Sequence, residues 1–268
     1  MLRTFNRLVF ETQWGADIYA PHTEGRVPTA VVGHGIDPTV FRPASRDEKA
    51  ELRKAWTKIL RFDLTKPKWV LVTHETNSYR KNPWALFPMM TALPQDTVLV
   101  FHCNELSQPG AGGMNLPRLA KQFGVENRVF FTGTGQNRVN LPERDLADLI
   151  RLADLTVSAI MGEGFGIGSI ESMACGVPRV ITDYTTSREI VGKAGLLARV
   201  GGWVPQPESP FVRAAVEFED MAAKVQQLRD DPKLYKRCSR NGPARVQAHY
   251  TTEKIGQDWV NLMARERS

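Results

Sequence analysis

Short apolar runs alternate along the chain with amphipathic stretches that have helical spacing. The apolar runs predict buried strands at residues 29–32, 68–73, 97–102, 128–132, 155–159, 179–182 and 195–198. The stretches between them predict helices at residues 47–60, 83–93, 116–123, 143–153, 168–174 and 187–191. This alternation is typical of an α/β fold in which helices cover both faces of a mostly parallel, Rossmann-like sheet. Right-handed crossovers then place the loops that follow the strands along one edge, where ligands bind.

The pattern changes in the last part of the chain. Residues 200–210 are rich in glycine and proline and are expected to form a loop. After residue 211 the sequence shows no strand pattern, and helical spacing predicts helices at residues 214–229, 233–248 and 252–265. The sequence therefore predicts one sheet domain followed by C-terminal helices.

Composition narrows the classes of protein that fit. A chain of 268 residues with 42% hydrophobic residues can bury a core, and no apolar run is long enough to predict a membrane span. Three scattered cysteines favour a reducing, cytoplasmic setting and argue against a zinc site. The net charge of +6 favours an anionic partner. The densest basic stretch, residues 233–245, is interpreted as an exposed helix face; it leaves peripheral membrane contact open and does not indicate nucleic-acid binding.

The most specific stretch follows the strand predicted at residues 155–159. It reads MGEGFGIGSIESMACGVP from residue 161 to residue 178 and places Glu163 and Glu171 eight positions apart. The glycines end the strand, and a short helix follows until Gly176. A helix that begins behind a glycine loop offers free backbone N–H groups to an anion, whereas carboxylates accept hydrogen bonds from sugar and ribose hydroxyls. The combination predicts a ligand with a central phosphate group and hydroxylated rings on both sides, which describes a nucleotide-sugar.

This stretch resembles the E-x7-E signature of retaining glycosyltransferases with the GT-B fold, in glycosyltransferase family four, also called glycosyl transferases group 1. The resemblance implies a donor-binding domain of the C-terminal GT-B type. It implies that Glu163 contacts the donor sugar and that Glu171 holds the ribose. It also implies that loop amides approach the sugar and the diphosphate, and by position these belong to Gly164, Phe165, Gly166, Ile167 and Gly168.

Other segments extend the resemblance. Arg80-Lys81-Asn82 is similar to a family motif whose lysine contacts the diphosphate, so Lys81 is expected to stabilise the leaving group. The arginine that relatives carry early in this loop is absent, and Arg80 is the candidate to replace it. Thr134 and Gly135, which follow the predicted strand at residues 128–132, are expected beside the nucleotide base.

The resemblance covers residues 28–265 and also implies a domain organisation. Residues 28–250 would form the nucleotide-sugar-binding domain, and residues 251–268 would form the closing helix. Residues 1–27 are either a remnant of the acceptor domain found in full enzymes or an added capping segment. We therefore expect a separate acceptor-domain protein or a homo-oligomer to supply the acceptor side. The resemblance implies no metal and no cofactor apart from the nucleotide-sugar donor.

Two alternatives stay open beside a retaining glycosyltransferase. The chain could be a non-catalytic nucleotide-sugar-binding subunit of another protein. Residues 164–169 also nearly match the G-x-G-x-x-G/A fingerprint of NAD-binding proteins, with Asp183 at the end of the next strand. Against NAD, several strand–helix units precede this loop, and the carboxylate of Glu163 would lie unfavourably beside a pyrophosphate.

Overall fold

A parallel six-stranded sheet forms the centre of the molecule. The computed structural model describes residues 6–23, 25–106, 113–133, 140–206 and 212–265. The strands are β3 (Trp69–Thr73), β4 (Thr97–Asn104), β5 (Val129–Gly133), β6 (Leu155–Ser158), β7 (Arg179–Thr182) and β8 (Gly195–Ala198). Their order in the sheet is β5-β4-β3-β6-β7-β8, so the order reverses between β3 and β6. Ligands of open α/β sheets bind at such a switch point, beyond the carboxyl ends of the strands.

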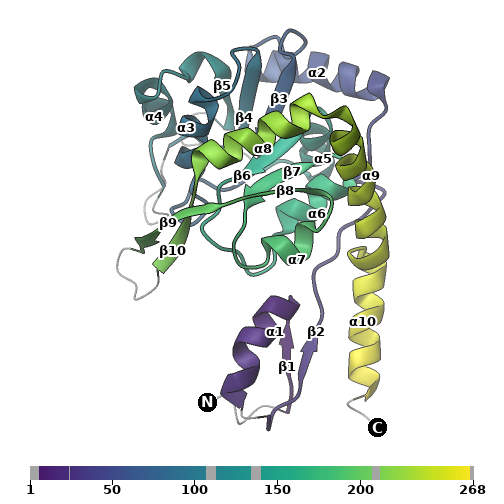
Figure 1. The fold of residues 1–268 in the computed structure, drawn as a ribbon. Coiled ribbons are helices and arrows are strands. Elements are labelled where there is room, and N and C mark those ends of the chain that lie inside the picture. Colours follow the sequence, from purple (N-terminus) through teal and green to yellow (C-terminus); the bar gives the residue numbers. More distant parts are fainter. Residues whose placement is uncertain (1–5, 24, 107–112, 134–139, 207–211, 266–268) are drawn as a thin grey trace.

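Helices cover both faces of this sheet (Figure 1). In β3, Leu71 packs into one apolar cluster, while Val70 and Val72 pack into the cluster on the opposite face. All three side chains are fully buried, as expected for a strand that is covered on both sides. The first cluster includes residues of α3 (Leu86–Thr91) and α8 (Phe218–Asp230), and the second includes residues of α2 (Arg46–Leu60), α5 (Glu143–Arg151) and α6 (Ile167–Ala174). The predicted α/β fold is confirmed.

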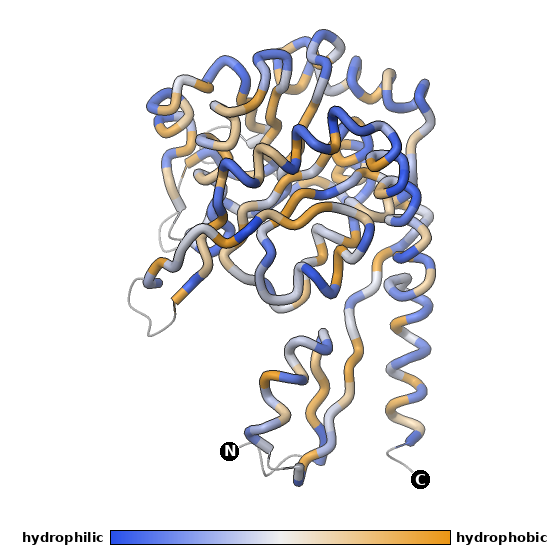
Figure 2. Tube along the Cα trace, in the orientation of Figure 1, coloured by the Kyte–Doolittle hydropathy of each residue, from blue (hydrophilic) through white to orange (hydrophobic). Residues whose placement is uncertain are grey.

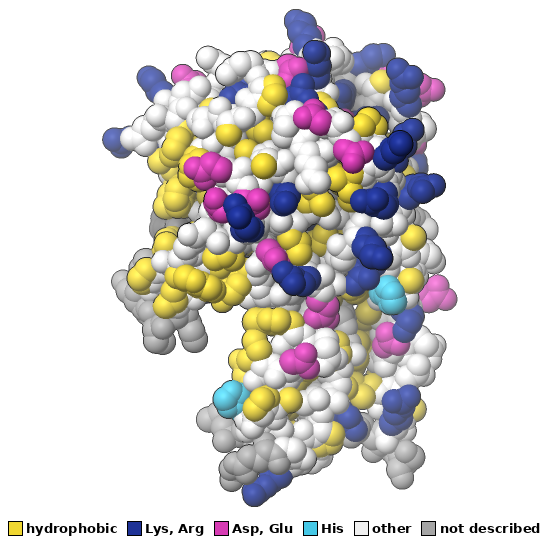
Figure 3. Space-filling model, in the orientation of Figure 1, with side chains coloured by type: hydrophobic (Ala, Val, Ile, Leu, Met, Phe, Trp, Pro, Cys, Tyr) yellow, Lys and Arg dark blue, Asp and Glu magenta, His cyan; other side chains and the backbone are white. Residues whose placement is uncertain are grey.

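The remaining elements connect and flank these layers. They are the 3-10 turns η3 (Pro83–Ala85) and η4 (Glu126–Arg128) and the helices α4 (Leu116–Gln122), α7 (Ser187–Val191), α9 (Pro232–His249) and α10 (Thr252–Arg265). Lys and Arg side chains gather over α9 in Figure 3. Lys233, Lys236, Arg237 and Arg240 are all exposed there, as predicted for a solvated helix face, but Arg245 is half-buried and donates to the carbonyl oxygens of Glu189 and Ile190. Membrane contact by this face stays a prediction.

The segment after β8 differs from its prediction. Residues 200–210 were expected to be a loop, but β9 (Val200–Pro205) pairs antiparallel with β10 (Val212–Val216) in a separate hairpin. No side chain of β9 is fully buried, so this strand lacks the apolar pattern that reveals a core strand. The helix predicted from residue 214 begins at Phe218 instead, because Ala214 and Val216 belong to β10 and turn their side chains into the protein.

The N-terminal residues form a small unit that lies apart from the central sheet (Figure 1). It consists of β1 (Leu8–Phe10), α1 (Gln13–Tyr19), the 3-10 turn η2 (Ala20–Thr23) and β2 (Thr29–Val31). The strand predicted at residues 29–32 exists, but it pairs parallel with β1 and is not part of the central sheet. The proposed domain limits at residues 27 and 250 stay predictions.

The C-terminal helix extends past the central sheet to the level of this N-terminal unit (Figure 1). The segment after β2 meets the start of α10 at Ile36 and Thr251, which form an isolated parallel bridge. Apolar positions are visible along α10 in Figure 2, and Trp259, Val260 and Met263 are exposed. Among the described residues, no helix combines the length and the apolar character that crossing a bilayer requires.

Candidate functional site

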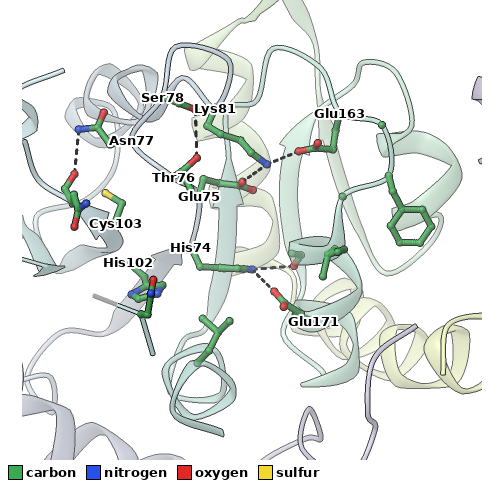
Figure 4. A pocket seen from close by; sticks show the side chains of 18 of the residues that line it. His74, Glu75, Thr76, Asn77, Ser78, Lys81, His102, Cys103, Glu163 and Glu171 are labelled. Carbon is green, nitrogen blue, oxygen red and sulfur yellow. Dashed lines mark hydrogen bonds and ion pairs between the residues drawn. The ribbon is translucent and has the colours of Figure 1, made fainter. Parts of the chain in front are cut away.

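A cavity of about 760 Å³ lies beyond the carboxyl ends of β3, β4 and β6. Its walls come from the loop after β3, the end of β4, the glycine loop after β6 and the first turns of α6 (Figure 4). Predicted site residues that line it are Lys81, Glu163, Gly164, Phe165, Gly166, Ile167, Gly168 and Glu171. Arg80 does not line the cavity, but its side chain contacts Glu163. Thr134 and Gly135 lie outside the described residues.

The glycine loop has the backbone conformation that the sequence predicts for a turn into a helix. Gly166 has a φ of +100°, in the region that favours glycine, and α6 begins at the next residue. Gly168 is needed for a different reason, because a Cβ there would lie 2.8 Å from Nε2 of His74. The first turn of α6 has backbone N–H groups without intrahelical partners, next to the cavity.

Glu163 is held by both of the predicted cations. Arg80 Nη1 lies 2.8 Å from Glu163 Oε1, and Lys81 Nζ forms a short ion pair with Oε2. The backbone N–H of Glu163 donates to Thr185 Oγ1 at 3.0 Å. The structure therefore brings the three predicted catalytic side chains together around one carboxylate.

Glu171 lies on the other side of the glycine loop and contacts a buried histidine. Nε2 of His74 is 3.3 Å from Glu171 Oε2 and 3.1 Å from the carbonyl oxygen of Gly168. The His74 side chain is 3% exposed, and its Nδ1 has no hydrogen-bond partner among the described residues. His74 thus positions both the loop and Glu171, the carboxylate that the family resemblance places at the ribose.

Two further charged residues complete the network. Glu75 lies 2.8 Å from Lys81 Nζ, accepts a hydrogen bond from Ser158 Oγ at 2.8 Å, and pairs with the buried Arg179. Burial alone would raise the pKa of Glu75, but the charges of Arg179 and then Lys81 outweigh burial and hold the pKa well below its ordinary value. Arg179 also donates to the carbonyl oxygen of Gly168 at 3.1 Å.

Sequence reasoning did not identify Glu75 or Arg179 as part of the site. One signal was available, because Arg179 begins a strand in which all four residues are buried. A charge in such a strand requires a buried partner. The identity of that partner depends on the order of strands in the sheet, which the sequence does not show.

His102 lines the cavity on the side of β4. Its Nδ1 lies 2.8 Å from Thr132 Oγ1. Burial, followed by the positive charge that His74 can carry, lowers the pKa of His102 to about 4. The imidazole of His102 is therefore neutral at neutral pH.

The N-terminal unit also contacts the site. Glu11 and His34 line the same cavity, and His34 Nε2 lies 3.0 Å from Glu11 Oε1. The His34 ring lies edge-on to Phe165 with 5.0 Å between centroids. Glu189 in α7 accepts hydrogen bonds from the backbone N–H groups of Gln13 and Trp14, each at 2.9 Å. These two N–H groups are in the first turn of α1, so Glu189 caps that helix from across the chain.

The cavity lies at the switch point of a parallel sheet, beside a glycine loop and a helix N-terminus. Rossmann-like α/β proteins bind phosphate-bearing ligands in this arrangement. The family model of the glycosyl transferases group 1 matches residues 109–245, just over half of the chain, and the protein belongs to this family. The family assignment favours the glycosyltransferase interpretation over the NAD-binding alternative.

Individual relatives agree with the assignment. The chain is 28% identical over 230 residues to the lipopolysaccharide core biosynthesis mannosyltransferase LpsB of Rhizobium meliloti (strain 1021), covering 85% of this chain and 58% of that protein. It is 25% identical over 214 residues to the putative glycosyltransferase EpsD of Bacillus subtilis (strain 168), covering 78% and 48%. The chain thus spans roughly half the length of these curated relatives.

Solved structures show the same fold. Sucrose-phosphate synthase from Thermosynechococcus elongatus superposes with a TM-score of 0.74 at 22% identity, over 98% of this chain and 60% of that one. Anabaena HepE in complex with UDP and glucose superposes with a TM-score of 0.74 at 18% identity, over 97% and 63%. The C-terminal domain of LpcC from Francisella tularensis superposes with a TM-score of 0.59 at 20% identity, over 81% of this chain and 100% of that domain. The predicted GT-B type of fold is confirmed.

Proposed function

We propose that the protein is a retaining glycosyltransferase, or the donor-binding half of one, and that its donor is a nucleotide-diphosphate sugar. One observation carries the proposal: Glu163, Glu171, Lys81 and the first turn of α6 all border one cavity at the switch point of the sheet. Anion-binding groups in its middle and a carboxylate on each side fit a ligand with a central diphosphate and two hydroxylated rings.

The contacts of each residue suggest its place along the donor. The amides at the start of α6, with Lys81 and Arg80, face the diphosphate. Glu171, held by His74 at 3.3 Å, accepts hydrogen bonds from the ribose, and Glu163 accepts them from the sugar. The base extends toward the end of β5, where Thr134 and Gly135 were expected to contact it. UDP and glucose in the HepE structure support this class of ligand for a protein of the same fold.

Transfer then breaks the bond between the sugar C1 and the terminal phosphate oxygen. Lys81 and Arg80 stabilise the negative charge that develops on the departing nucleoside diphosphate. The acceptor hydroxyl attacks C1 from the face that the leaving group vacates, and its proton passes to the departing phosphate, so the configuration is retained. Glu163 orients the sugar and does not attack it, because its carboxylate accepts hydrogen bonds from the sugar hydroxyls. We also propose that the reaction uses no metal ion and no further cofactor, and that the protein is cytoplasmic. These three points stay predictions.

A non-catalytic nucleotide-sugar-binding subunit is the second candidate. Such a subunit would use the same cavity to bind the donor without transferring the sugar. In either case we propose that the acceptor side involves a separate protein or a second copy of this chain. Analytical ultracentrifugation combined with a transfer assay distinguishes these arrangements from a fully active monomer.

Calorimetry with a panel of UDP- and GDP-sugars, followed by hydrolysis and transfer assays, tests the function. Glu171→Ala is expected to weaken nucleotide binding about tenfold, because a charge-assisted hydrogen bond to the ribose is lost. Lys81→Met is expected to lower turnover about 100-fold, because the leaving phosphate loses a positive charge. Lys236→Met, on the exposed face of α9, is the matched control.

Binding without turnover on any acceptor would favour the subunit over the enzyme. If no UDP- or GDP-sugar binds, or if neither Glu171→Ala nor Lys81→Met changes binding or turnover, the proposed function is wrong.

A further inference from the structure

The two cations that should receive the diphosphate are already occupied in this structure. Arg80 contacts one carboxylate oxygen of Glu163 at 2.8 Å, and Lys81 contacts the other. Figure 4 shows the Lys81 ammonium group between Glu163 and Glu75. A diphosphate that binds to Arg80 and Lys81 must therefore displace the Glu163 carboxylate or share the cations with it.

The two carboxylates that hold Lys81 differ in how firmly they are fixed. Glu75 is 9% exposed, lies 2.8 Å from Lys81, and is held in turn by Arg179 and Ser158. Removing Glu75 would leave Arg179 as a buried charge without its partner, which is strongly unfavourable. Removing Glu163 would leave no buried cation without a partner, because Lys81 keeps Glu75 and Arg80 is 38% exposed and can be solvated. Glu163 is thus the exchangeable partner of Lys81, and Glu75 is the permanent one.

The charges of the network explain why an exchange is needed. Arg80, Lys81 and Arg179 oppose the two carboxylates, which leaves one formal positive charge in excess. A diphosphate would bring at least two negative charges next to Glu163. The Glu163 carboxylate would then lie beside like charges unless new hydrogen-bond donors replaced its cations. Sugar hydroxyls are such donors, and a nucleoside diphosphate without a sugar has none at this position.

We propose that Glu163 makes the site distinguish the nucleotide-sugar donor from the nucleoside diphosphate product. In the donor complex, the diphosphate binds Arg80 and Lys81, and the sugar hydroxyls donate to the freed Glu163 carboxylate. After the sugar leaves, Glu163 loses these donors, pairs again with both cations and promotes release of the diphosphate. This inference rests on the proposed function, because it assumes that the cavity binds a nucleotide-sugar.

The backbone around these residues fits an exchange that moves side chains alone. Met161 N–H donates to the carbonyl oxygen of Arg80 at 2.9 Å, and Glu163 N–H donates to Thr185 Oγ1 at 3.0 Å. The first bond joins the glycine loop to the loop after β3, the second joins it to the segment after β7, and neither involves the Glu163 carboxylate. The carboxylate can therefore change partners while the loops stay joined.

Calorimetry on the full chain with pyrophosphate, UDP and GDP, and then with UDP- and GDP-sugars, tests the inference. Glu163→Gln is expected to tighten binding of pyrophosphate and of the preferred nucleoside diphosphate about tenfold, because a competing carboxylate is removed. The same variant is expected to weaken binding of the matching nucleotide-sugar, because an amide oxygen accepts hydrogen bonds from the sugar hydroxyls less strongly than a carboxylate does. Opposite changes for the two ligands are the distinctive result.

Glu11→Gln is the matched control. It removes a carboxylate from the same cavity, but Glu11 pairs with His34 and not with the two cations. Its effect on pyrophosphate binding is expected to be less than about twofold. Glu163→Asp, whose shorter side chain reaches both cations less well, should change affinities in the same direction as Glu163→Gln, and circular dichroism checks that each variant is folded.

The possible results separate this inference from the proposed function. If Glu163→Gln tightens both ligands equally, or weakens both, the exchange is wrong even though nucleotide-sugars bind. An effect of Glu11→Gln as large as that of Glu163→Gln would also overturn the exchange, since any nearby carboxylate would then suffice. If the wild-type protein binds no nucleotide-sugar, the proposed function itself fails.

Discussion

Strands β3 and β6 lie side by side, and each end of the pair has a cluster of charged side chains. Asp154 immediately precedes β6, and its carboxylate contacts Lys49 at 2.8 Å, Arg53 at 2.7 Å and the backbone N–H of Val70 at 2.7 Å. At the opposite end, beyond the carboxyl termini of the same strands, are Glu75 and Glu163 with their cations. The two ends thus use similar chemistry in different surroundings.

The difference lies in which parts of the protein supply the partners. The cations at Asp154 come from α2, and the N–H comes from β3, so regular elements supply these three contacts of the carboxylate. At the site end the cations Arg80 and Lys81 come from a loop, and a cavity adjoins Lys81. His74 Nδ1 and Arg179 Nε are buried there without a partner among the described residues. A charge cluster whose polar atoms all have hydrogen-bond partners stabilises the fold. A charge cluster that keeps unpaired polar atoms beside a cavity is suited to bind a ligand.

The largest expected effect on stability is at the Asp154 end. Asp154→Asn is expected to lower the free energy of unfolding by about 3 kcal/mol, because Lys49 and Arg53 lose a half-buried counter-charge. Urea unfolding measures this change. Asp63→Asn is the matched control, since Asp63 pairs with Lys66 at an exposed position and its loss is expected to cost less than about 1 kcal/mol. Equal losses for the two variants would contradict the structural role of Asp154.

A second prediction concerns pH and the site end. The pKa of His102 is about 4 in the folded protein, below the ordinary value of 6.5. Between pH 4 and pH 6.5 the unfolded chain therefore binds more protons than the folded protein does. The free energy of unfolding should therefore fall as the pH falls from about 6.5 to 4, with His102 contributing about 2–3 kcal/mol to the loss. Urea unfolding of His102→Asn across this range should show a shallower decline. A decline in His102→Asn as steep as that of the wild type would contradict this role of His102.

The sequence predicts the central sheet well because its strands are buried on both faces. Val70, Leu71 and Val72 form a continuous apolar run, and such runs identify strands of a parallel sheet. The hairpin β9–β10 was missed because β9 contains glycines and has no fully buried side chain. The burial of β9 alternates along the strand, but its inward positions are only half-buried, so the sequence carries little apolar signal.

The site was predictable where its residues are neighbours in sequence and not where they meet across strands. The acids of the E-x7-E stretch and Lys81 appear in local motifs, and the structure places all three at one cavity. The contact of Glu75 with Ser158, and its pair with Arg179, depend on β3 lying beside β6 and β6 beside β7. Local spacing carries no information about that order, so this supporting part of the network had to come from the structure.

The smallest expected effect on stability gives the sharpest test of the contrast between the two ends. Glu163→Gln removes a carboxylate that contacts two cations, as Asp154→Asn does, yet it is expected to cost less than about 1 kcal/mol of unfolding free energy. The reason is that Lys81 keeps Glu75 at 2.8 Å, while Arg80 keeps the carbonyl oxygen of Gly162 at 2.9 Å and access to solvent. Urea unfolding without ligand, run in parallel on both variants, measures the difference. A loss for Glu163→Gln as large as that for Asp154→Asn would mean that Glu163 locks the two loops together, and it would then be unable to change partners when a diphosphate binds.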